Sequence, residues 1–229
     1  MQRLVFLAVL ATLTACVDRT NVALVPEVPT VELETGWRTI LTSEDSQRLS
    51  QLPETWKSAL ASSRRYQKQI LSEGDLLVAN AARAHPAPSP GSYHCRLVKL
   101  GAPVGKEPPF RAFSEFFCYI RGDVGSSLFF AKQTGTERPG GWLHADGDRQ
   151  LVLTGAKQRP GSDTQLTYGS EPERDLVGVV ERIGPFRWRL VLPWRGTSVG
   201  LDIYELTPVP LEQQATEPKG APADQASER

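Results

Sequence analysis

Histidine and cysteine are scarce in this chain of 229 residues, which contains three of each. The histidines, His85, His94 and His144, are scattered, and no HExxH motif or other two-histidine metal spacing occurs. Neither an SxxK motif nor a P-loop is found. Metal, nucleophilic and phosphate chemistry need such groupings, so the sequence predicts no metal, no cofactor and no enzymatic activity.

An excess of one charge is also lacking, because Lys plus Arg is 26 and Asp plus Glu is 26. Binding to nucleic acid phosphates needs a basic excess, so we expect no nucleic-acid partner. The hydrophobic fraction of 40% is sufficient for a packed core. The 19 glycines and 18 prolines favour a protein with many turns over a helical bundle.

The N-terminal segment, MQRLVFLAVLATLTAC, has one basic residue, Arg3, followed by about ten apolar residues up to Leu13. This stretch is too short to span a bilayer, which takes roughly twenty residues, but it suits a signal peptide. Its end, Leu13-Thr14-Ala15-Cys16, resembles the lipobox of bacterial lipoproteins. The resemblance implies lipidation at Cys16, cleavage before it and a membrane as partner. Val17, rather than Asp, then favours the outer membrane by analogy with the enteric sorting rule.

Lipidation of Cys16 leaves two thiols, Cys95 and Cys118, an even number that suits an oxidising compartment. Each lies in a short run typical of a β-strand. Two neighbouring antiparallel strands bring such a pair within bonding distance, so we expect a structural disulfide. A reactive or metal-binding cysteine pair is the alternative.

The rest of the chain falls into segments of different composition. Residues 1–15 are the expected signal peptide, 16–36 a lipidated tether and 37–85 a helical segment, with a disordered tail over 210–229. Thr42 or Ser43 can cap a first helix, and Pro53 suits the first position of a second. That second helix carries a face from Trp56 to Ile70 and stops at Gly74.

Residues 91–209 consist of short runs rich in Val, Ile, Leu, Phe and Tyr, separated by Gly, Pro and Asp turns. This pattern predicts a mainly β fold, a small antiparallel barrel of about eight strands, with a sandwich as the alternative. In residues 187–192 the alternation places Trp188 and Leu190 on one face and two arginines on the other. We expect strands near 92–100, 113–121, 126–133, 141–145, 149–156, 174–183, 186–193 and 198–206.

An ordered set of short motifs resembles the proteobacterial family known as domain of unknown function 4893. The resemblance spans about Trp37 to Pro208, implies no activity, and supports the fold boundaries and the Cys95–Cys118 bridge. The motifs are Gly91-x-Tyr93-x-Cys95-Arg96, Lys99-Leu100-Gly101, Phe117-Cys118, Lys132-x-Thr134-Gly135-x-x-Arg138-Pro139, Tyr168-Gly169, Arg174-Asp175-x-x-Gly178-x-x-Glu181-Arg182, Arg187-Trp188-Arg189-Leu190-Val191 and Leu201-Asp202-x-x-Glu205-Leu206-x-Pro208.

Basic residues make the second half of the chain locally positive. They form either a solvated face interleaved with acids or a patch that contacts anionic headgroups or a glycan phosphate. The candidate ligand or partner contacts are Arg138, Arg174, Arg182, Arg187 and Arg189.

Together these features predict a membrane-anchored envelope lipoprotein on the periplasmic side, with a non-enzymatic binding or structural role. Its partner is expected to be a protein or a small envelope molecule. One alternative is an inhibitor of a secreted or periplasmic protease, by analogy with small disulfide-bonded barrels. Another is a hydrolase whose site has no recognisable sequence motif, with His94, His144 and Asp146 as the residues to test.

Overall fold

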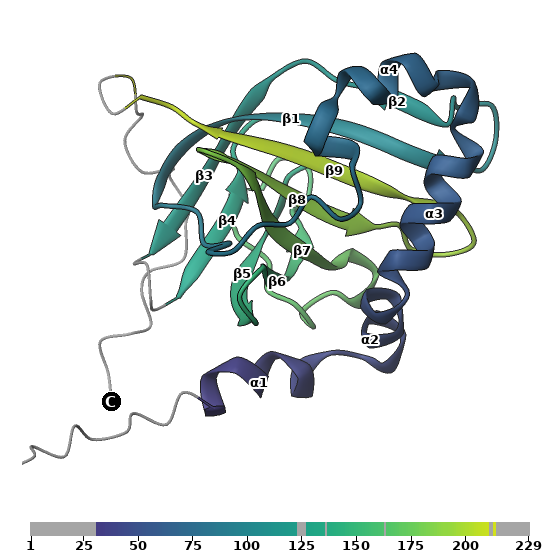
Figure 1. Cartoon of the computed structure of the whole chain (residues 1–229). Helices are drawn as coiled ribbons and strands as arrows, with labels where there is room; N and C mark the ends of the chain where they lie inside the picture. Colours follow the sequence, from purple (N-terminus) through teal and green to yellow (C-terminus); the bar gives the residue numbers. More distant parts are fainter. Residues whose placement is uncertain (1–30, 123–126, 136, 163, 211–212, 214–229) are drawn as a thin grey trace, which may run out of the picture.

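The structure of the protein, a computed structural model, describes residues 31–122, 127–135, 137–162, 164–210 and 213. Within them, antiparallel strands form one sheet that curls into a barrel (Figure 1). The strands are β1 (Gly91–Ala102), β2 (Phe110–Ala112), β3 (Phe116–Gly122), β4 (Leu128–Lys132), β5 (Pro139–Asp146), β6 (Gln150–Lys157), β7 (Asp175–Gly184), β8 (Arg187–Pro193) and β9 (Val199–Pro208).

The barrel closes because its first and last strands pair with each other. Neighbouring strands follow in the order β1-β3-β4-β5-β6-β7-β8-β9, and β9 then pairs with β1 from Tyr93↔Pro208 to Ala102↔Val199. β2 adds a short extra strand to β1. The predicted eight-stranded barrel is confirmed and the sandwich alternative is wrong, since a sandwich would leave edges unpaired. The sequence did not predict β2, which has only three residues.

Alternation along each strand divides the side chains between two hydrophobic cores. The barrel interior is filled from all eight strands, with Tyr93, Ile120, Phe130 and Leu190 among its fully buried side chains. The face predicted from residues 187–192 is confirmed, because Trp188 and Leu190 belong to this interior core. The second core lies on the outer face of the barrel, beneath a layer of helices.

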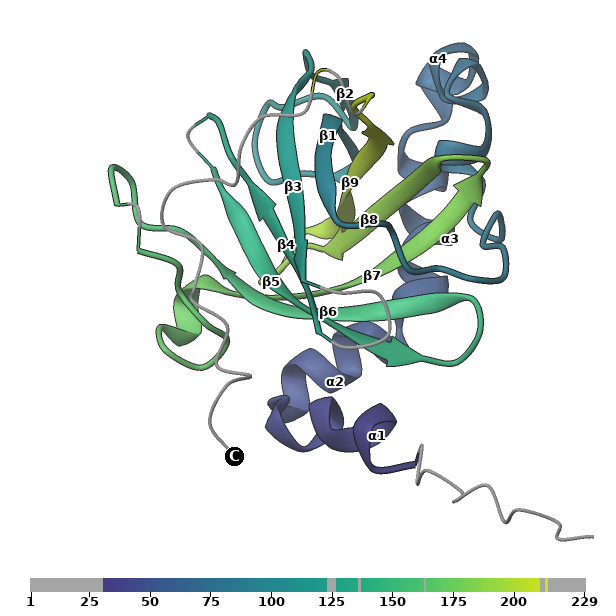
Figure 2. The same ribbon diagram turned by 90° about the vertical axis from the view of Figure 1, so that its left-hand side faces the viewer.

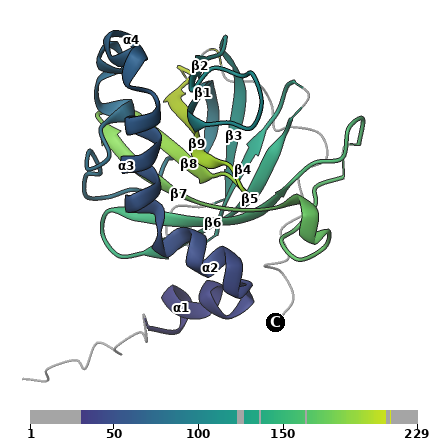
Figure 3. The same ribbon diagram turned by 90° about the vertical axis from the view of Figure 1, so that its right-hand side faces the viewer.

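The helical layer precedes the barrel in sequence and lies across its outer face (Figures 2 and 3). Thr42 is the N-cap of α2, since its hydroxyl accepts from the Asp45 N–H, and Pro53 is the second residue of α3. α1 starts inside the stretch 16–36 that was expected to be a tether; residues 16–30 and the expected signal peptide lie outside the described residues. The elements are α1 (Val31–Ile40), α2 (Ser43–Ser50), α3 (Leu52–Ser62), η1 (Arg64–Tyr66), α4 (Gln67–Ser72), η2 (Gly74–Leu77) and, between β6 and β7, η3 (Pro172–Arg174).

The helical face expected from Trp56 to Ile70 does not belong to one helix, because the run breaks at Ser63. Ser63 is fully buried, and its hydroxyl donates to the carbonyl of Pro109 at 2.9 Å. This bond ties the end of α3 to the segment before β2. The tertiary contact therefore overrides the local helical period.

The outer core fixes the helices to the barrel through apolar contacts. Trp56 and Ala59 of α3 pack with Val98, Val191 and Ile203 of the barrel wall. None of the described helices combines the length and apolar character needed to cross a membrane.

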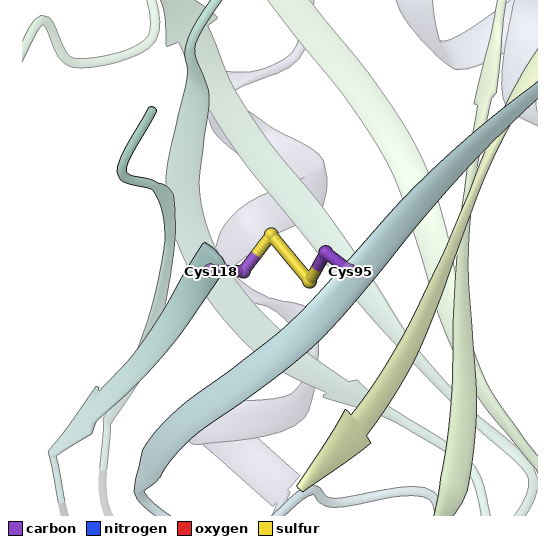
Figure 4. Close-up of a disulfide and its surroundings, with 2 residues drawn as sticks. All are labelled: Cys95 and Cys118. Carbon is purple, nitrogen blue, oxygen red and sulfur yellow. A yellow bond between two sulfur atoms is a disulfide. The ribbon is translucent and has the colours of Figure 1, made fainter. Parts of the chain in front are cut away.

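A disulfide joins Cys95 of β1 to Cys118 of β3 inside the barrel (Figure 4). The two Cα atoms are 5.9 Å apart, and both side chains are buried in the interior core. The residues are diagonal neighbours, because Tyr93 lies opposite Cys118 and Cys95 opposite Phe116. The predicted cysteine pair is therefore confirmed, at the distance and on the strands expected.

Candidate functional site: a pocket between the helices and the barrel

A row of polar side chains crosses six adjacent strands on the outer face of the barrel. Each member lies directly opposite the next in the strand register, and the charges alternate in sign along most of the row. The members, in order, are Asp146, Gln150, Glu181, Arg189, Glu205 and Arg96. We call this set the polar row.

Hydrogen bonds join neighbouring members of the polar row. Gln150 Nε2 donates to Asp146 Oδ2 at 2.7 Å, and Arg189 Nε donates to Glu181 Oε2 at 2.6 Å. Arg96 Nη2 donates to Glu205 Oε2 at 2.7 Å. Such bonds satisfy groups that the helical layer removes from water.

Arg189 also holds the chain segment of residues 75–84, which we call the strap. Its side chain is fully buried, and its Nη1 and Nη2 atoms donate to the carbonyls of Leu76, Val78 and Ala79 at 2.8–3.0 Å. Its guanidinium lies 4.9 Å from the ring centroid of Trp56. The strap is therefore fixed over the middle of the polar row.

A pocket of about 680 Å³ lies between the helical layer and the end of the polar row that Asp146, Gln150 and Glu181 form. Apolar side chains form most of its walls, and the polar row supplies one stripe. Its helix side is lined by Trp37, Leu41, Leu49, Leu52 and Trp56, its barrel side by Val152, Val179, Asp146, Gln150 and Glu181, and its strap side by Ala79 and Asn80. We call this space the helix–barrel pocket.

The rim of the pocket is exposed, whereas its deeper walls are buried. Ser46, Ser50 and Lys57 line it from the exposed side of α2 and α3. Arg38 Nη2 of α1 donates to Asp146 Oδ1 at 2.6 Å, which fixes α1 against β5. The pocket thus opens to solvent along the helices and ends at the barrel wall.

The charges around the pocket cancel in pairs. Arg38 lies against Asp146, and Arg189 lies behind Glu181. Lys57 at the rim pairs with Glu54 at 2.6 Å. The pocket therefore presents hydrogen-bonding groups without an excess of either charge.

A second network fixes α2 from the side of the β6–β7 connection. Tyr168 Oη donates to Asp45 Oδ2 at 2.6 Å, and Asp45 is fully buried beside Arg48. Burial, together with the hydrogen bond to Asp45, raises the pKa of Tyr168. This network positions the helix that carries Ser46, Leu49 and Ser50 of the pocket.

The three histidines lie at separate places. His94 faces outward from β1, away from Cys95, and its ring lies tilted beside that of Phe117 with centroids 5.2 Å apart. His144 on β5 lies 2.8 Å from Thr154 Oγ1, and burial lowers its pKa. His85 directly follows the strap, and its backbone N–H donates to the Asp148 carbonyl. Within the described residues, no three His, Cys, Asp or Glu side chains converge as a metal site would require.

The five arginines expected to contact a ligand or partner do not gather at one point, and each has a partner within the chain. Arg182 donates to the Ala84 carbonyl at 2.8 Å, and Arg187 to Glu205 at 2.6 Å. Arg138 donates to the Ser162 carbonyl, and Arg174 pairs with Glu171 at 2.9 Å. Arg189 is buried and binds Glu181 and the strap, so all five side chains bind other parts of the same chain. Their contact with a ligand stays a prediction.

The stretch from Gly196 to Gly200 fits the pattern GxSxG, although no GxSxG nucleophile elbow was expected in the sequence. A nucleophile elbow needs a strand followed by a helix, whereas this stretch runs from the turn after β8 into the first two residues of β9. Its serine, Ser198, borders two smaller hollows of about 430 and 240 Å³. No hydrogen bond joins it to a histidine among the described residues. The stretch therefore lacks the strand–helix setting of a nucleophile elbow.

The pocket could not be recognised in the sequence because its lining residues come from four separate stretches, 37–57, 79–80, 146–152 and 179–181. Asp146 was named only as a residue to test in the hydrolase alternative, and Gln150 and Glu181 had no assigned functional role. The sequence signal that identifies them is the alternation along each strand, because each of the three occupies an outward-facing position.

The fold is an eight-stranded antiparallel barrel with a helical layer against its outer face and a pocket between the two. A family model described as Domain of unknown function (DUF4893) matches residues 37–206, and the chain belongs to this family. The matched range includes every residue that lines the pocket. No curated protein and no solved structure matches the chain.

Proposed function

We propose that this protein is a lipid-anchored envelope protein that binds a small amphipathic molecule in the helix–barrel pocket without converting it chemically. The observation that carries the proposal is the pocket itself. Its volume of about 680 Å³ lies within the range of small-molecule sites, about 300–1,000 Å³. Its apolar walls with a few convergent polar groups have the composition typical of such sites.

The anchor supports this function because it places the pocket near a source of amphipathic molecules. Cys16 precedes the first described residue by 15 positions, so it lies at most about 50 Å along the chain from α1. α1 carries Trp37 and Arg38 of the pocket. An anchored chain would therefore hold the pocket close to the bilayer surface.

The anchor is tested by Cys16→Ser in the producing bacterium. Loss of the acyl chains removes the hydrophobic attachment, so the variant should move from the membrane fraction to the soluble envelope fraction. Val17→Ala is the matched control and should stay in the membrane fraction with a lipid-modified mass. Membrane retention of the serine variant, or an unmodified mass of the parent, would remove the anchor from the proposal.

Pocket binding is tested with the mature chain carrying Cys16→Ser, so that no detergent competes for an apolar probe. The probe is N-phenyl-1-naphthylamine, a neutral aromatic compound whose emission rises in apolar surroundings. Energy transfer from tryptophan reports bound probe, since Trp37 and Trp56 line the pocket. We expect saturable binding.

Two tryptophan substitutions on the same helix distinguish binding in the pocket from non-specific binding of the probe. Ser50→Trp places an indole at the exposed rim of the pocket and should abolish the saturable signal. Ser43→Trp places the same side chain on an exposed position of α2 outside the pocket and should leave binding unchanged. Equal binding by both variants would disprove the assignment of the pocket.

A further inference from the structure

We propose that the ligand of the helix–barrel pocket is a neutral saccharide, bound with a sugar ring between the polar row and the two indoles. This inference rests on the proposed function and narrows it to one chemical class. Three features carry it: the spacing of the polar row, the cancelled charges and the aromatic wall.

The spacing of the polar row suits a ring with several hydroxyl groups. Asp146, Gln150 and Glu181 lie directly opposite one another on three adjacent strands. Adjacent strands are about 4.8 Å apart, so the three side chains offer hydrogen-bonding groups at regular intervals of that size. Hydroxyls on alternate carbons of a pyranose ring are separated by a comparable distance. A flat aromatic ligand carries no such series of groups.

Two oxygens of this row remain available to a ligand. Glu181 uses Oε2 for Arg189, and Gln150 uses Nε2 for Asp146. Glu181 Oε1 and Gln150 Oε1 have no hydrogen-bond partner in the part of the chain that the structure describes. Both are acceptors, which hydroxyl donors of a sugar would satisfy.

The charge pattern favours a neutral ligand over an anionic or cationic one. Asp146 is paired with Arg38, and Glu181 with the buried Arg189. Neither carboxylate is therefore left to attract an ammonium group. The guanidinium groups of Arg38 and Arg189 are likewise occupied, so the described side chains of the pocket floor offer a phosphate no free cation.

The aromatic wall suits the apolar face of a sugar ring. Trp37 and Trp56 both line the pocket opposite the barrel. A guanidinium lies over one face of each ring, Arg38 4.2 Å from the Trp37 centroid and Arg189 4.9 Å from the Trp56 centroid, so the opposite face of each indole is the one left for a sugar. Aromatic rings carry negative charge on their faces and attract the weakly positive C–H groups of a pyranose. The pocket therefore combines the two surfaces that a saccharide presents, hydroxyls at its edge and C–H groups on its face.

The test uses displacement of N-phenyl-1-naphthylamine from the mature Cys16→Ser chain by two neutral trisaccharides. Maltotriose represents a plain hexose glycan, and triacetylchitotriose an N-acetylated amino-sugar polymer. We expect at least one of them to displace the probe at millimolar concentration or below, and the stronger competitor identifies the source. Glucose 6-phosphate, an anionic sugar, should compete more weakly than the better trisaccharide.

Gln150→Leu distinguishes hydrogen bonding from apolar filling. It removes the middle one of the three polar-row residues that line the pocket, at similar volume, so saccharide affinity should fall about tenfold while binding of the apolar probe persists. Gln69→Leu, on the exposed side of α4, makes the same change outside the pocket and should alter neither. Unfolding midpoints of both variants serve to show that the fold is kept.

The outcomes separate this inference from the proposed function. Probe binding that Ser50→Trp abolishes, with no displacement by either trisaccharide, would overturn the saccharide and leave a pocket for another small molecule. Saccharide binding that is unaffected by Ser50→Trp and Gln150→Leu would place the sugar elsewhere and overturn the inference. If neither probe nor sugar binds, both proposals fail.

Discussion

Arg189 on β8 lies directly opposite Glu181 on β7, and its Nε donates to Glu181 Oε2 at 2.6 Å. Both side chains point away from the barrel interior, yet the helical layer and strap bury them, with Arg189 at 0% and Glu181 at 8% exposure. A buried guanidinium needs an opposite charge and hydrogen-bond acceptors. Glu181 supplies the charge, and the strap carbonyls supply the acceptors.

Loss of Glu181 should therefore destabilise the protein strongly. Glu181→Ala leaves Arg189 buried without a counter-charge, which costs about 3–5 kcal/mol. Glu181→Gln keeps one acceptor and the side-chain volume, and should cost less. Urea unfolding followed by tryptophan fluorescence measures both values.

Glu54→Ala is the matched control, because Glu54 pairs with Lys57 at the exposed surface. Its free energy of unfolding should change by no more than about 0.5 kcal/mol. A Glu181→Ala variant as stable as this control would show that the buried pair contributes no more than a surface pair.

The arginines of β8 show what alternation along a strand can predict from the sequence and what it cannot. The pattern of residues 187–192 correctly placed Arg187 and Arg189 on the face opposite Trp188, because the period of a strand is fixed by its backbone. It could not show that helices cover that face. Burial of Arg189 depends on the strap, more than 100 positions away in sequence, and no local pattern encodes such a contact.

Neither the closure of the barrel nor the pocket could be predicted from local sequence patterns. Eight strand runs were visible in the sequence, but the pairing of Tyr93 with Pro208 decides between barrel and sandwich. The pocket joins Trp37, Gln150 and Glu181 from three distant elements. Each of these residues has an ordinary role in its own segment, so only the folded arrangement reveals the site.

Acidification should reduce stability through His144. Burial lowers its pKa below the ordinary value of 6.5. As the pH falls below about 6.5, the unfolded chain therefore takes up the proton before the native protein does. Stability then decreases with falling pH, by up to about 1.4 kcal/mol per pH unit, until the lowered native pKa is reached.

His144→Gln removes this titration and keeps a group that can bond to Thr154 Oγ1. The measurement compares urea unfolding at pH 7.5 and pH 5.5 for the parent and the variant. The variant should lose less stability between the two values. Equal losses in the two proteins would show that His144 titrates normally in the native state.

The disulfide should stabilise the barrel mainly by restricting the unfolded chain. Cys95 and Cys118 are separated by 23 positions, for which the chain-entropy model gives about 3 kcal/mol. The double variant Cys95→Ala, Cys118→Ala should therefore unfold at a lower urea concentration than the parent. Dithiothreitol should lower the midpoint of the parent and leave the double variant unchanged; sensitivity of that variant to the reductant would exclude this disulfide as its target.

Gly155 should tolerate no side chain, because it faces another glycine across the paired strands β5 and β6. Gly155 lies directly opposite Gly141, and a Cβ added to Gly155 would come within 2.5 Å of the Gly141 Cα and closer still to the Gly140 carbonyl. The obstacle is the backbone of a paired strand, which cannot move without breaking the hydrogen bonds between the strands, so Gly155→Ala should cost at least about 2 kcal/mol.

Gly36→Ala is the control, since its added Cβ meets nothing within 4 Å and alanine favours the helix α1 by about 1 kcal/mol. Urea midpoints that move in opposite directions for the two variants would show that close strand approach, rather than loss of glycine as such, sets the difference; a Gly155→Ala protein as stable as the parent would mean that β5 and β6 lie farther apart at this point.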